Sequence, residues 1–302
     1  MNIRDWRTLS SAEAAPLYQS EIARWETVLH WDTRANWRLV EAARASGTLP
    51  GVVVRDSCGA VQGWAFYLLH RAVLQVGALV CRSPAATGAI VGAMLGSPEA
   101  ETASSVTLFT FADAPALAGE LQQAGFATSH YRYLQRPLTV EAGAAMASSG
   151  ADCRGWRPAD LVPVAQLLSR AYGVADASRP FVRTGRPEDW VEYVEQLVTT
   201  RGCGVFLPEC TVIGASAAGV DAVVLATHLG VGTAHLAQVA VEPSGQRSGR
   251  GRRILAAALS NLRDAAYVRA TLLVSAANGA ANGLYGQWGF VEAARFIAAV
   301  RD

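Results

Sequence analysis

The sequence predicts an α+β protein built from two similar units in tandem, each a mixed, mostly antiparallel sheet flanked by helices in a three-layer α/β arrangement. Helix-like and strand-like patterns follow in the same order in both halves, and each half closes with a Gly-Phe pair and a strand. A small, polar stretch at residues 139–155 separates the halves. We therefore expect a first domain at 1–138, a linker at 139–155 and a second domain at 156–302. The alternative is two unrelated α/β domains whose likeness is accidental.

Apolar residues that recur every three to four positions predict the helices, and short β-branched or alternating runs predict the strands. The first half is expected to contain helices at 12–29 and 33–45, strands at 51–54, 64–69 and 74–81, a helix at 89–95, and strands at 106–109 and 131–134. The second half is expected to contain helices at 161–172 and 188–200, strands at 204–207, 221–228 and 234–241, a helix at 254–262, a strand at 270–274, a short helix and a final strand ending at Val300.

Composition limits the classes of partner that this chain is built to bind. With 302 residues, of which 51% are hydrophobic, the chain is long enough for two domains with buried cores. Its formal net charge of +1 gives no field that attracts nucleic acid or a membrane surface. No apolar run approaches the roughly 18 residues of a membrane span, and the first residues lack the pattern of a signal peptide. We therefore expect a cytoplasmic protein, monomeric or homodimeric, that binds neither nucleic acid nor membranes.

The cysteines predict neither a disulfide framework nor a metal site. There are five, an odd number, and no two of them are spaced as Cys-x-x-Cys. They stand at positions Cys58, Cys81, Cys153, Cys203 and Cys210. Reduced thiols are typical of cytoplasmic proteins, and we expect no bound metal.

The most informative segment is the glycine-rich stretch at 246–251, which follows an expected strand and precedes an expected helix. The first N–H groups of a helix have no partners within the helix, so they bind anions, and glycines at 249 and 251 let a phosphate approach the backbone. A Walker loop is excluded because the chain has no lysine. A dinucleotide-binding fingerprint is excluded because Ile254 replaces its third glycine. The stretch therefore predicts a site for another phosphorylated cofactor.

Two linked motifs in the second half resemble those of the GCN5-related N-acetyltransferases (GNAT). Gln246, Gly249 and Gly251 match the acyl-CoA loop Gln/Arg-x-x-Gly-x-Gly/Ala at every defined position. The family signature Asn-x-x-Ala-x-x-Leu-Tyr followed by Gly-Phe is matched by Asn278, Ala281, Leu284, Tyr285, Gly289 and Phe290. The likeness covers residues 156–302. It implies an acyl-CoA-dependent N-acyltransferase, most often an N-acetyltransferase, with acetyl-CoA as co-substrate and no metal.

The resemblance also assigns roles to individual residues. The cofactor pyrophosphate would lie on the loop and helix start, formed by Gln246, Arg247, Ser248, Gly249, Arg250, Gly251 and Arg252. Val239 and Val241 on the preceding strand would pair with the pantetheine arm, and Asn278 would contact the cofactor near its sulfur. Tyr285 would protonate the departing thiolate as a general acid. The structural alternatives are a solvated helix start for the arginines, a helix cap for Asn278 and a core position for Tyr285.

Two histidines on the expected hairpin are candidates for the base that deprotonates the amine. His235 precedes the glycine loop on the strand where relatives can carry a carboxylate base, so its role follows from the resemblance. We expect His228 to face it across the hairpin, because the turn at 230–233 is symmetric about the pair. A histidine titrates near neutral pH, which suits this proton transfer. The alternative is a solvent-facing strand residue.

The substrate side is specified less well. In the family it is formed by the first two helices and the loop between them, and here that loop carries Arg179, Phe181 and Arg183. These side chains would bind a carboxylate or phosphate of the acceptor, and a solvated loop is the alternative. The expected acceptor is the primary amine of a small molecule. A protein amine, an aminoacyl-tRNA-type donor and a non-catalytic sensor of CoA or metabolites are the alternatives.

The first half departs from the family pattern. The residues after Pro84 lack the glycine loop, and Leu121 occupies the position of the tyrosine. We therefore interpret residues 1–138 as a degenerate copy that does not catalyse. Five tryptophans of this half are expected to fill its core, with the wall of a substrate cleft as the alternative. They are Trp6, Trp25, Trp31, Trp37 and Trp64.

Overall fold

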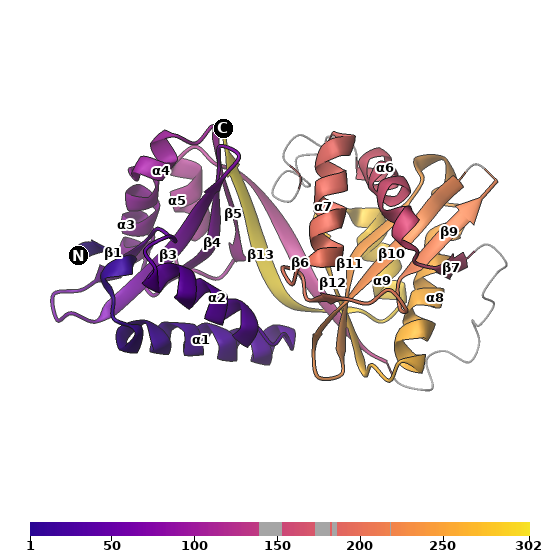
Figure 1. Ribbon diagram of the computed structural model, residues 1–302, viewed down its shortest axis with the longest axis horizontal. Helices are drawn as coiled ribbons and strands as arrows, with labels where there is room; N and C mark the ends of the chain where they lie inside the picture. The colour runs from indigo at the N-terminus through magenta and orange to yellow at the C-terminus, as the bar shows by residue number, and fades with distance from the viewer. Residues whose placement is uncertain (139–152, 173–181, 183–185, 218) are drawn as a thin grey trace.

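The computed structural model describes residues 1–138, 153–172, 182, 186–217 and 219–302, and it shows two halves joined by long strands (Figure 1). The first half contains β1 (Asn2–Asp5), α1 (Ser11–Leu29), α2 (Arg34–Ala45), β2 (Gly51–Arg55), β3 (Val61–His70), β4 (Val73–Cys81), α3 (Pro84–Leu95), α4 (Pro98–Glu101), β5 (Ser105–Phe111), α5 (Leu117–Gln123) and β6 (Ala127–Pro137). The second half contains β7 (Cys153–Gly155), α6 (Leu161–Tyr172), α7 (Pro187–Thr199), β8 (Val205–Phe206), β9 (Val212–Ser216), β10 (Gly219–Gly230), β11 (Thr233–Val241), α8 (Arg250–Asp264), β12 (Arg269–Ser275), α9 (Gly279–Gln287) and β13 (Val291–Arg301).

Among the described residues, the strands form one sheet of thirteen. Their order is β1-β2-β3-β4-β5-β13-β6-β12-β11-β10-β9-β7, and β8 pairs with β10 beside this path. Pairing is antiparallel except between β4 and β5 and between β11 and β12, which are parallel. These two parallel pairs stand at the same place in the element order of the two halves. The predicted fold class, two tandem α+β units with mostly antiparallel sheets, is confirmed.

Each half places its last strand in the sheet of the other half. β6 pairs with β12, so that Gln135 lies opposite Thr271, and β13 pairs with β5, so that Phe296 lies opposite Phe111. β6 and β13 also pair with each other, and together they form the connection between the halves (Figure 1). The sequence predicted both closing strands at their positions in the chain. It did not predict the exchange, because strand patterns carry no information on the pairing partner.

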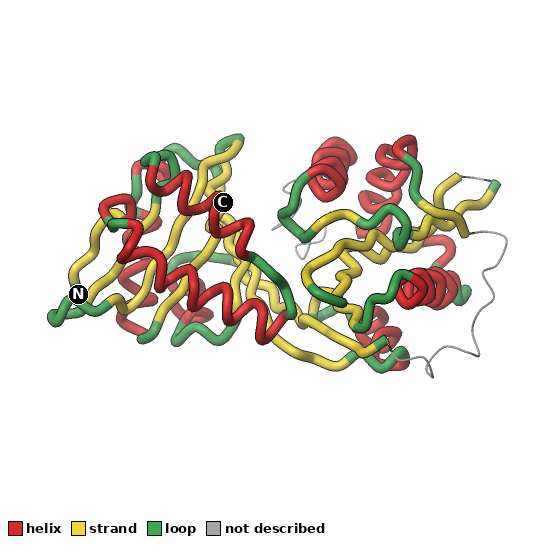
Figure 2. The backbone as a smooth tube through the Cα atoms, turned by 60° about the horizontal axis from the view of Figure 1, so that its bottom comes forward, coloured by secondary structure: helices red, strands yellow, loops and turns green. Residues whose placement is uncertain are grey.

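Helices cover both faces of the sheet in each half (Figure 2). In the first half, one face carries a core that includes Ile90 of α3, and the other carries a core that includes Trp6 and residues of α1. In the second half, the corresponding cores include Ile254 of α8 and Trp190 of α7. Among the described residues, no helix combines the length and apolar character that crossing a membrane requires. Helices and sheet therefore form three layers in each half.

A fifth apolar cluster lies where the two halves meet. It includes Leu29 from α1, Phe111 from β5, Tyr133 from β6 and Phe296 from β13, all of them buried. The rings of Phe296 and Phe111 are stacked with their centroids 4.5 Å apart, and Trp25 packs edge-on against both. The residues of this cluster come from both halves of the sequence, so packing as well as strand pairing holds the halves together.

Local sequence rules explain where helices begin. Ser10 accepts a hydrogen bond from the N–H of Glu13, and the Glu13 carboxylate accepts from the N–H of Ser10, which is a capping box at the start of α1. Ser83 accepts from the N–H of Ala86 in the same way, ahead of Pro84 at the first position of α3. Helix α3 therefore begins before the predicted residue 89, because the cap and the proline define its start.

Two expectations from the sequence need correction. The strand expected at 204–207 is reduced to the two residues of β8, and β10 pairs mainly with β9, which was missed. β9 ends in Gly214, Ala215 and Ser216, whose small side chains give a weak strand signal, and pairing with β10 overrides it. Of the predicted linker, residues 139–152 lie outside the described residues, whereas 153–155 form β7 on β9. The domain boundaries themselves remain a prediction.

Replacing Phe296 with alanine should destabilise the first half, although the residue belongs to the last strand of the second. The variant loses stacking on Phe109 and Phe111, and a buried Phe→Ala change costs about 3–5 kcal/mol. Urea unfolding followed by tryptophan fluorescence measures this loss, because five of the tryptophans lie in the first half. Val291→Ala, at an exposed position of the same strand, is the control and should cost less than about 1 kcal/mol. An unchanged first-half transition in Phe296→Ala would contradict the exchange.

Candidate active site

The two parallel strands of the second half separate after four paired residues. Pairing runs from Thr233 with Arg269 to Leu236 with Leu272, yet β11 continues to residue 241 and β12 to residue 275. Ala237 is the extra residue of a β-bulge, since its neighbours Leu236 and Gln238 pair with consecutive residues of β10. We refer to residues 237–241 of β11 and 273–275 of β12 as the β11–β12 fork. Within the described residues, no strand pairs with residues 237–241 of β11 along the edge that faces β12.

The glycine-rich loop lies at the open end of the fork and leads into α8. Gly249 has φ of +81°, a conformation that favours glycine, and it directly precedes the first residue of α8. A Cβ placed on Gly251 would lie 3.6 Å from Val241 and 3.7 Å from Leu284, so the loop, β11 and α9 meet here. In the described part of the chain, no backbone carbonyl accepts from the N–H groups of Gly249, Gly251 or Arg252. These N–H groups, at the start of a long helix, fit a phosphate.

Several side chains around the loop already form ion pairs or hydrogen bonds with other groups of the protein. Arg250 Nη2 lies 2.6 Å from the Asp221 carboxylate and the arginine side chain is only 8% exposed, so it anchors α8 to β10. The Arg250 side chain is therefore already paired with the half-buried Asp221 carboxylate, and the expected contribution of its charge at the phosphates remains a prediction. Arg252 donates to Gln287 at 2.6 Å, and Ser248 Oγ donates to the Gly245 carbonyl at 2.6 Å. Cofactor contacts by Gln246, Arg247 and the loop backbone remain predictions.

Asn278 directly precedes helix α9 and serves as its cap, which was the structural alternative for this residue. Asn278 Oδ1 accepts from the N–H of Ala281 at 3.0 Å and caps the helix. Asn282, which sequence analysis missed, donates to the carbonyls of Ser275 and Asn278 at 2.9 and 2.7 Å. Its Oδ1 accepts from Arg132 of β6 at 2.8 Å. Asn282 therefore fixes α9 to the end of β12, and no motif position marked it.

Three phenols gather beside the fork. Tyr285 on α9 is buried against Phe290, and burial together with the nearby phenol of Tyr172 raises its pKa above the usual value. Tyr172, at the end of α6, donates its hydroxyl to the Val239 carbonyl at 3.0 Å and stacks on Trp190. Burial and then Tyr172 also raise the pKa of Tyr131 on β6. Tyr285 is therefore protonated at neutral pH and able to donate. No motif marked Tyr172 in the sequence beyond its place on an amphipathic helix.

His235 lies on the buried face of β11 near the fork. Its Nδ1 is 2.9 Å from the hydroxyl of Thr271, and its ring stacks on Tyr133 at a centroid distance of 5.7 Å. The Thr271 hydroxyl donates to the Ala234 carbonyl at 3.2 Å, so it accepts from His235 and Nδ1 carries the proton. Burial lowers the pKa of His235 to about 4. The imidazole is therefore neutral at pH 7, with the lone pair on Nε2.

His228 does not face His235, contrary to expectation. The register pairs His235 with Thr227 and His228 with Ala234, so the two imidazoles point to opposite faces of the sheet. Leu229 is an extra residue between His228 and Gly230, and this irregularity shifts the register by one. His228 Nδ1 lies 3.2 Å from the hydroxyl of Tyr267 instead. The structure places His235, but not His228, on the face of the sheet that carries Tyr133 beside the fork.

The corresponding place in the first half is closed. β4 and β5 also separate after four parallel pairs, and Gly77 is the bulge residue that corresponds to Ala237. A Cβ on Gly77 would overlap the ring of Phe66, which packs directly against this glycine. Across the strands, Thr110 Oγ1 donates to the Leu79 carbonyl at 3.4 Å. By register this carbonyl matches that of Val239, so a side chain of β5 itself spans the fork of the first half.

The start of α3 also differs from that of α8. Ser83 already caps the helix by accepting from the N–H of Ala86. The Glu120 carboxylate lies close to its second turn, 3.0 Å from the position that a Cβ on Gly88 would take. A carboxylate there disfavours a phosphate, because like charges repel.

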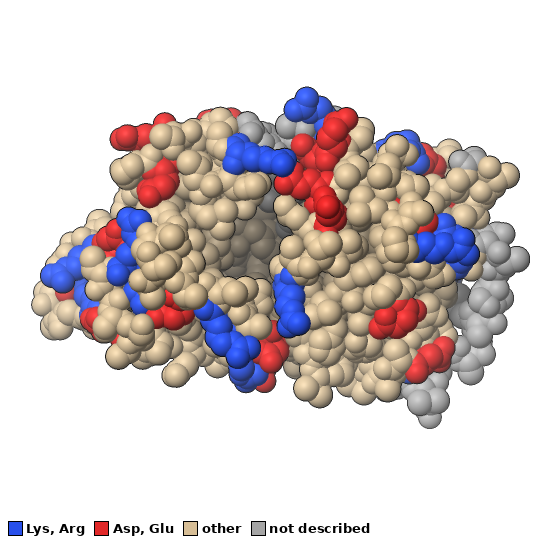
Figure 3. All heavy atoms as spheres, viewed as in Figure 1, with Lys and Arg blue, Asp and Glu red and all other residues tan. Residues whose placement is uncertain are grey.

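The predicted substrate residues Arg179, Phe181 and Arg183 lie outside the described residues. The molecule is hollowed between its two halves (Figure 3), and the turn between β3 and β4 meets α7 through an ion pair of Arg71 with Glu192. Among the residues that the structure describes, no three His, Cys, Asp or Glu side chains gather as a metal ion requires.

Comparison with known proteins identifies the fold. Residues 205–292 match the family model described as acetyltransferase (GNAT) domain, and no curated protein matches the chain. A GCN5-related N-acetyltransferase from Sphaerobacter thermophilus is similar in structure, with a TM-score of 0.58 and 17% identity over 83% of this chain and 80% of that one. A tandem GNAT protein from the clavulanic acid biosynthesis pathway has a TM-score of 0.55 and 14% identity, over 84% and 82%. A GNAT-family acetyltransferase from Colwellia psychrerythraea has a TM-score of 0.55 and 11% identity, over 100% of both chains.

Stability should depend on pH through His235. Burial lowers its pKa to about 4, below the value of about 6.5 in an unfolded chain, so the unfolded state binds more protons between these values. The free energy of unfolding should therefore fall by about 3 kcal/mol through this residue as pH drops from 6.5 to 4. His235→Gln, which introduces the residue of the matching position Gln75, should flatten the dependence of Tm on pH. Exposed His130→Gln is the control, and equal slopes in all three proteins would contradict the assignment.

Proposed function

Because the second half of the chain carries a GNAT acetyltransferase domain, we propose that the protein is an acyl-CoA-dependent N-acyltransferase, with acetyl-CoA as the usual donor. The acceptor in this proposal is the primary amine of a small molecule, in a cytoplasmic setting. The observation that carries the proposal is the β11–β12 fork, which has unpaired N–H groups of the glycine loop at its open end and a buried phenol beside it.

The residues of the fork fit the parts of an acyl-CoA. N–H groups of Gly249, Gly251 and Arg252 suit the pyrophosphate, since no backbone carbonyl of the described residues occupies them. The unpaired edge of β11 from Val239 to Val241 suits the amide-bearing pantetheine arm, because amides pair with a strand edge as another strand would. The bound donor supplies a thioester carbonyl that an amine attacks. Gly251 keeps the loop close to β11, where the pyrophosphate and the pantetheine arm of the donor join.

In the proposed reaction, the amine nitrogen forms a bond to the thioester carbonyl carbon and the carbon–sulfur bond breaks. The proton that the nitrogen loses passes through solvent water and restores the Tyr285 phenol after it has protonated the sulfur. Tyr285 gives its phenolic proton to the departing sulfur. The raised pKa of Tyr285 keeps this proton in place until negative charge develops on the sulfur. The acyl group passes directly to the amine, and no cysteine of the described residues lies in the fork as a covalent carrier.

His235 suits a more limited role than that of a strong base. With a pKa of about 4, its Nε2 is too weak a base to strip a proton from an ordinary ammonium ion. It accepts a hydrogen bond well, however, and Thr271 fixes its orientation through Nδ1. We therefore assign it the orientation of an amine that arrives neutral, and the amine's own pKa sets the pH dependence of the rate.

Only the second half catalyses in this proposal. In the first half, Phe66 packs on the bulge glycine, Thr110 bridges the strands of the fork and Glu120 places negative charge near the start of α3. These three features leave neither space nor charge for an acyl-CoA. The first half then serves as a wall of the substrate space and as the partner that supplies β6 to the catalytic sheet.

The test is a thiol-release assay with acetyl-CoA across a panel of amines, combined with calorimetric titration of CoA. Binding with thiol release on at least one small amine supports the proposal. Release only with a protein or an aminoacyl-tRNA-type partner would move the activity to that alternative. Binding without release on any amine would favour a sensor, and no binding of CoA at all would remove the assignment.

Tyr285→Phe should lower kcat by about a hundredfold while leaving the Kd for CoA within a factor of two. The hydroxyl removed donates only when the thiolate leaves, so its loss affects the chemical step. Thiol release under saturating donor measures kcat, and titration calorimetry measures Kd. Tyr267→Phe removes a hydroxyl that contacts His228, away from the fork, and is the matched control. An equal rate in both variants would exclude Tyr285 as the acid.

Tyr172→Phe should tighten binding of CoA by about threefold to tenfold. In the free protein the Tyr172 hydroxyl donates a hydrogen bond to the Val239 carbonyl, and this bond competes with the cofactor for that carbonyl. One intramolecular hydrogen bond is worth about 0.5–1.5 kcal/mol. Tyr193→Phe is the control, because that hydroxyl accepts from Gln238 and does not touch Val239. Weaker binding in Tyr172→Phe than in the control would show that the hydroxyl contacts the cofactor directly.

A further inference from the structure

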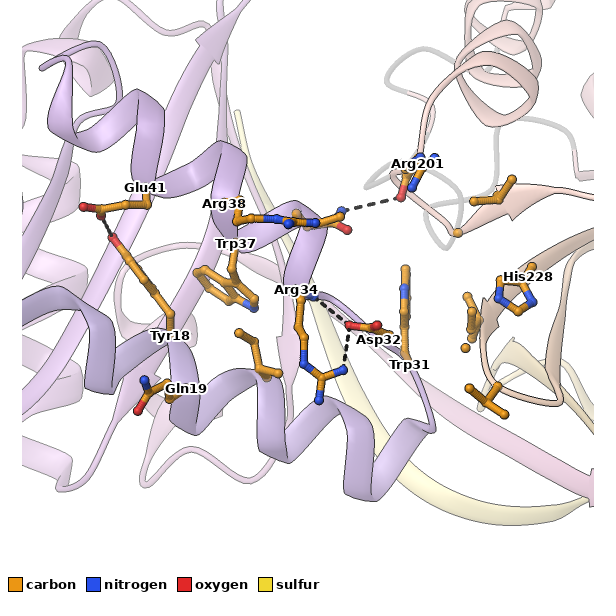
Figure 4. A pocket seen from close by; sticks show the side chains of 18 of the residues that line it. Tyr18, Gln19, Trp31, Asp32, Arg34, Trp37, Arg38, Glu41, Arg201 and His228 are labelled. Atoms are coloured by element: carbon orange, nitrogen blue, oxygen red, sulfur yellow. Dashed lines mark hydrogen bonds and ion pairs between the residues drawn. The ribbon is translucent and has the colours of Figure 1, made fainter. Parts of the chain in front are cut away.

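A second concave site lies at the seam between the halves, apart from the fork. It is a cavity of about 760 Å³, with one wall from α1 and α2 and the other from residues 201–205 and the turn between β10 and β11 (Figure 4). The N–H of Asp32 donates to the Leu229 carbonyl at 2.9 Å, and Asn36 Nδ2 lies 3.5 Å from the Arg201 carbonyl, so backbone contacts tie the walls together. None of the residues that line it belongs to the β11–β12 fork.

The carboxylates of this seam cavity are already neutralised. Glu41 accepts from Arg44, Ser11 and Tyr18, and these hydrogen bonds, that of Arg44 first, lower its pKa to about 2. Asp32 lies 3.2 Å from Arg34. Neither carboxylate is therefore available to attract a cationic ligand.

Two guanidinium groups of the cavity have no such partner in the part of the chain that the structure describes. Within the described residues, neither Arg38 of α2 nor Arg201 after α7 makes an ion pair or donates a side-chain hydrogen bond. They come from different halves and lie along the same side of the cavity (Figure 4). Arginine presents several N–H donors in a plane that matches a carboxylate or a phosphate. The excess charge of the cavity is thus positive and concentrated at one side.

The remaining wall is aromatic and apolar. Trp31 and Trp37 stand on either side of Arg34 in Figure 4, and Tyr18 and Ile22 complete this surface. Tyr18 and Trp37 are stacked with centroids 5.2 Å apart, which holds the Trp37 ring in place. Both indoles are only half-buried, although tryptophan usually fills cores, so part of each ring faces the cavity. A volume in this range suits a small organic molecule.

We propose that the seam cavity binds a small organic anion with a flat apolar body. Its acidic group lies between Arg38 and Arg201, and its body lies against Trp31 and Trp37. Because the two arginines belong to different halves, the ligand bridges the seam. This site is independent of the acyl-CoA fork and of the activity proposed for it.

The probe for this site is 2-naphthoate, with neutral 2-naphthamide as the ligand of equal shape. Naphthoate should bind one per chain, quench tryptophan fluorescence and bind equally well with the fork saturated by CoA. Naphthamide should bind at least tenfold more weakly, because it lacks the negative charge and the second acceptor oxygen with which a carboxylate pairs with guanidinium groups. Equal binding of the two ligands, or displacement of naphthoate by CoA, would overturn the proposal.

Substitutions of the two arginines test whether naphthoate binds in the seam cavity. The double variant Arg38→Gln with Arg201→Gln should weaken naphthoate binding at least tenfold and leave naphthamide binding unchanged. Arg4→Gln with Arg82→Gln, which removes the same charge from residues that do not line the cavity, is the matched control and should bind as the parent does. Equal naphthoate affinity in the two double variants would exclude the seam cavity. Since all four arginines are at least partly exposed, both variants should fold, and the comparison of the two ligands on the parent protein needs no variant.

Discussion

The structure depends on the exchange of the two closing strands. β6 completes the sheet of the second half against β12, β13 completes that of the first against β5, and the two strands pair with each other. Neither half holds a complete sheet from its own residues. The exchange also sets the distance between the α1–α2 pair and the β10–β11 turn, which is why a cavity with a wall from each half exists at the seam. A mobile linker between two closed domains would have no such fixed seam.

The same backbone irregularity has different consequences in the two halves. Both parallel pairs separate after four residues, next to a bulge in the inner strand. In the first half, Thr110 bridges the strands and Phe66 packs on the bulge glycine, so the fork is part of the core. In the second half, the equivalent carbonyl accepts a hydrogen bond from Tyr172, which lies at a helix end and not on a strand of the fork. Side chains of the core, rather than the course of the backbone, thus distinguish a closed fork from an open one.

Local features of the candidate site were predictable and long-range ones were not. The glycine loop and the cap at Asn278 follow from residues a few positions apart, and the structure places both as short-range rules require. The pairing of the histidines failed, because one extra residue at Leu229 rotates His228 to the opposite face. The ion pair of Arg250 with Asp221 was not predicted, because Asp221 lies on a strand that is distant in the sequence. Tyr172 and Asn282 were missed, since their importance lies in contacts with distant backbone carbonyls and side chains.

The sequence by itself determined the repeated order of elements, the helix starts and the glycine-rich loop ahead of α8, because hydrophobic periodicity, caps and glycine conformations act over a few residues. Only the tertiary structure decided which half each closing strand joins, which fork stays open, the protonation of His235 and, among the residues that the structure describes, the lack of an ion-pair partner for Arg38 and Arg201. Each of these depends on contacts between segments that are distant in sequence, through strand pairing, burial or charge neutralisation. Such contacts are fixed by packing of the whole chain, and no local pattern records them.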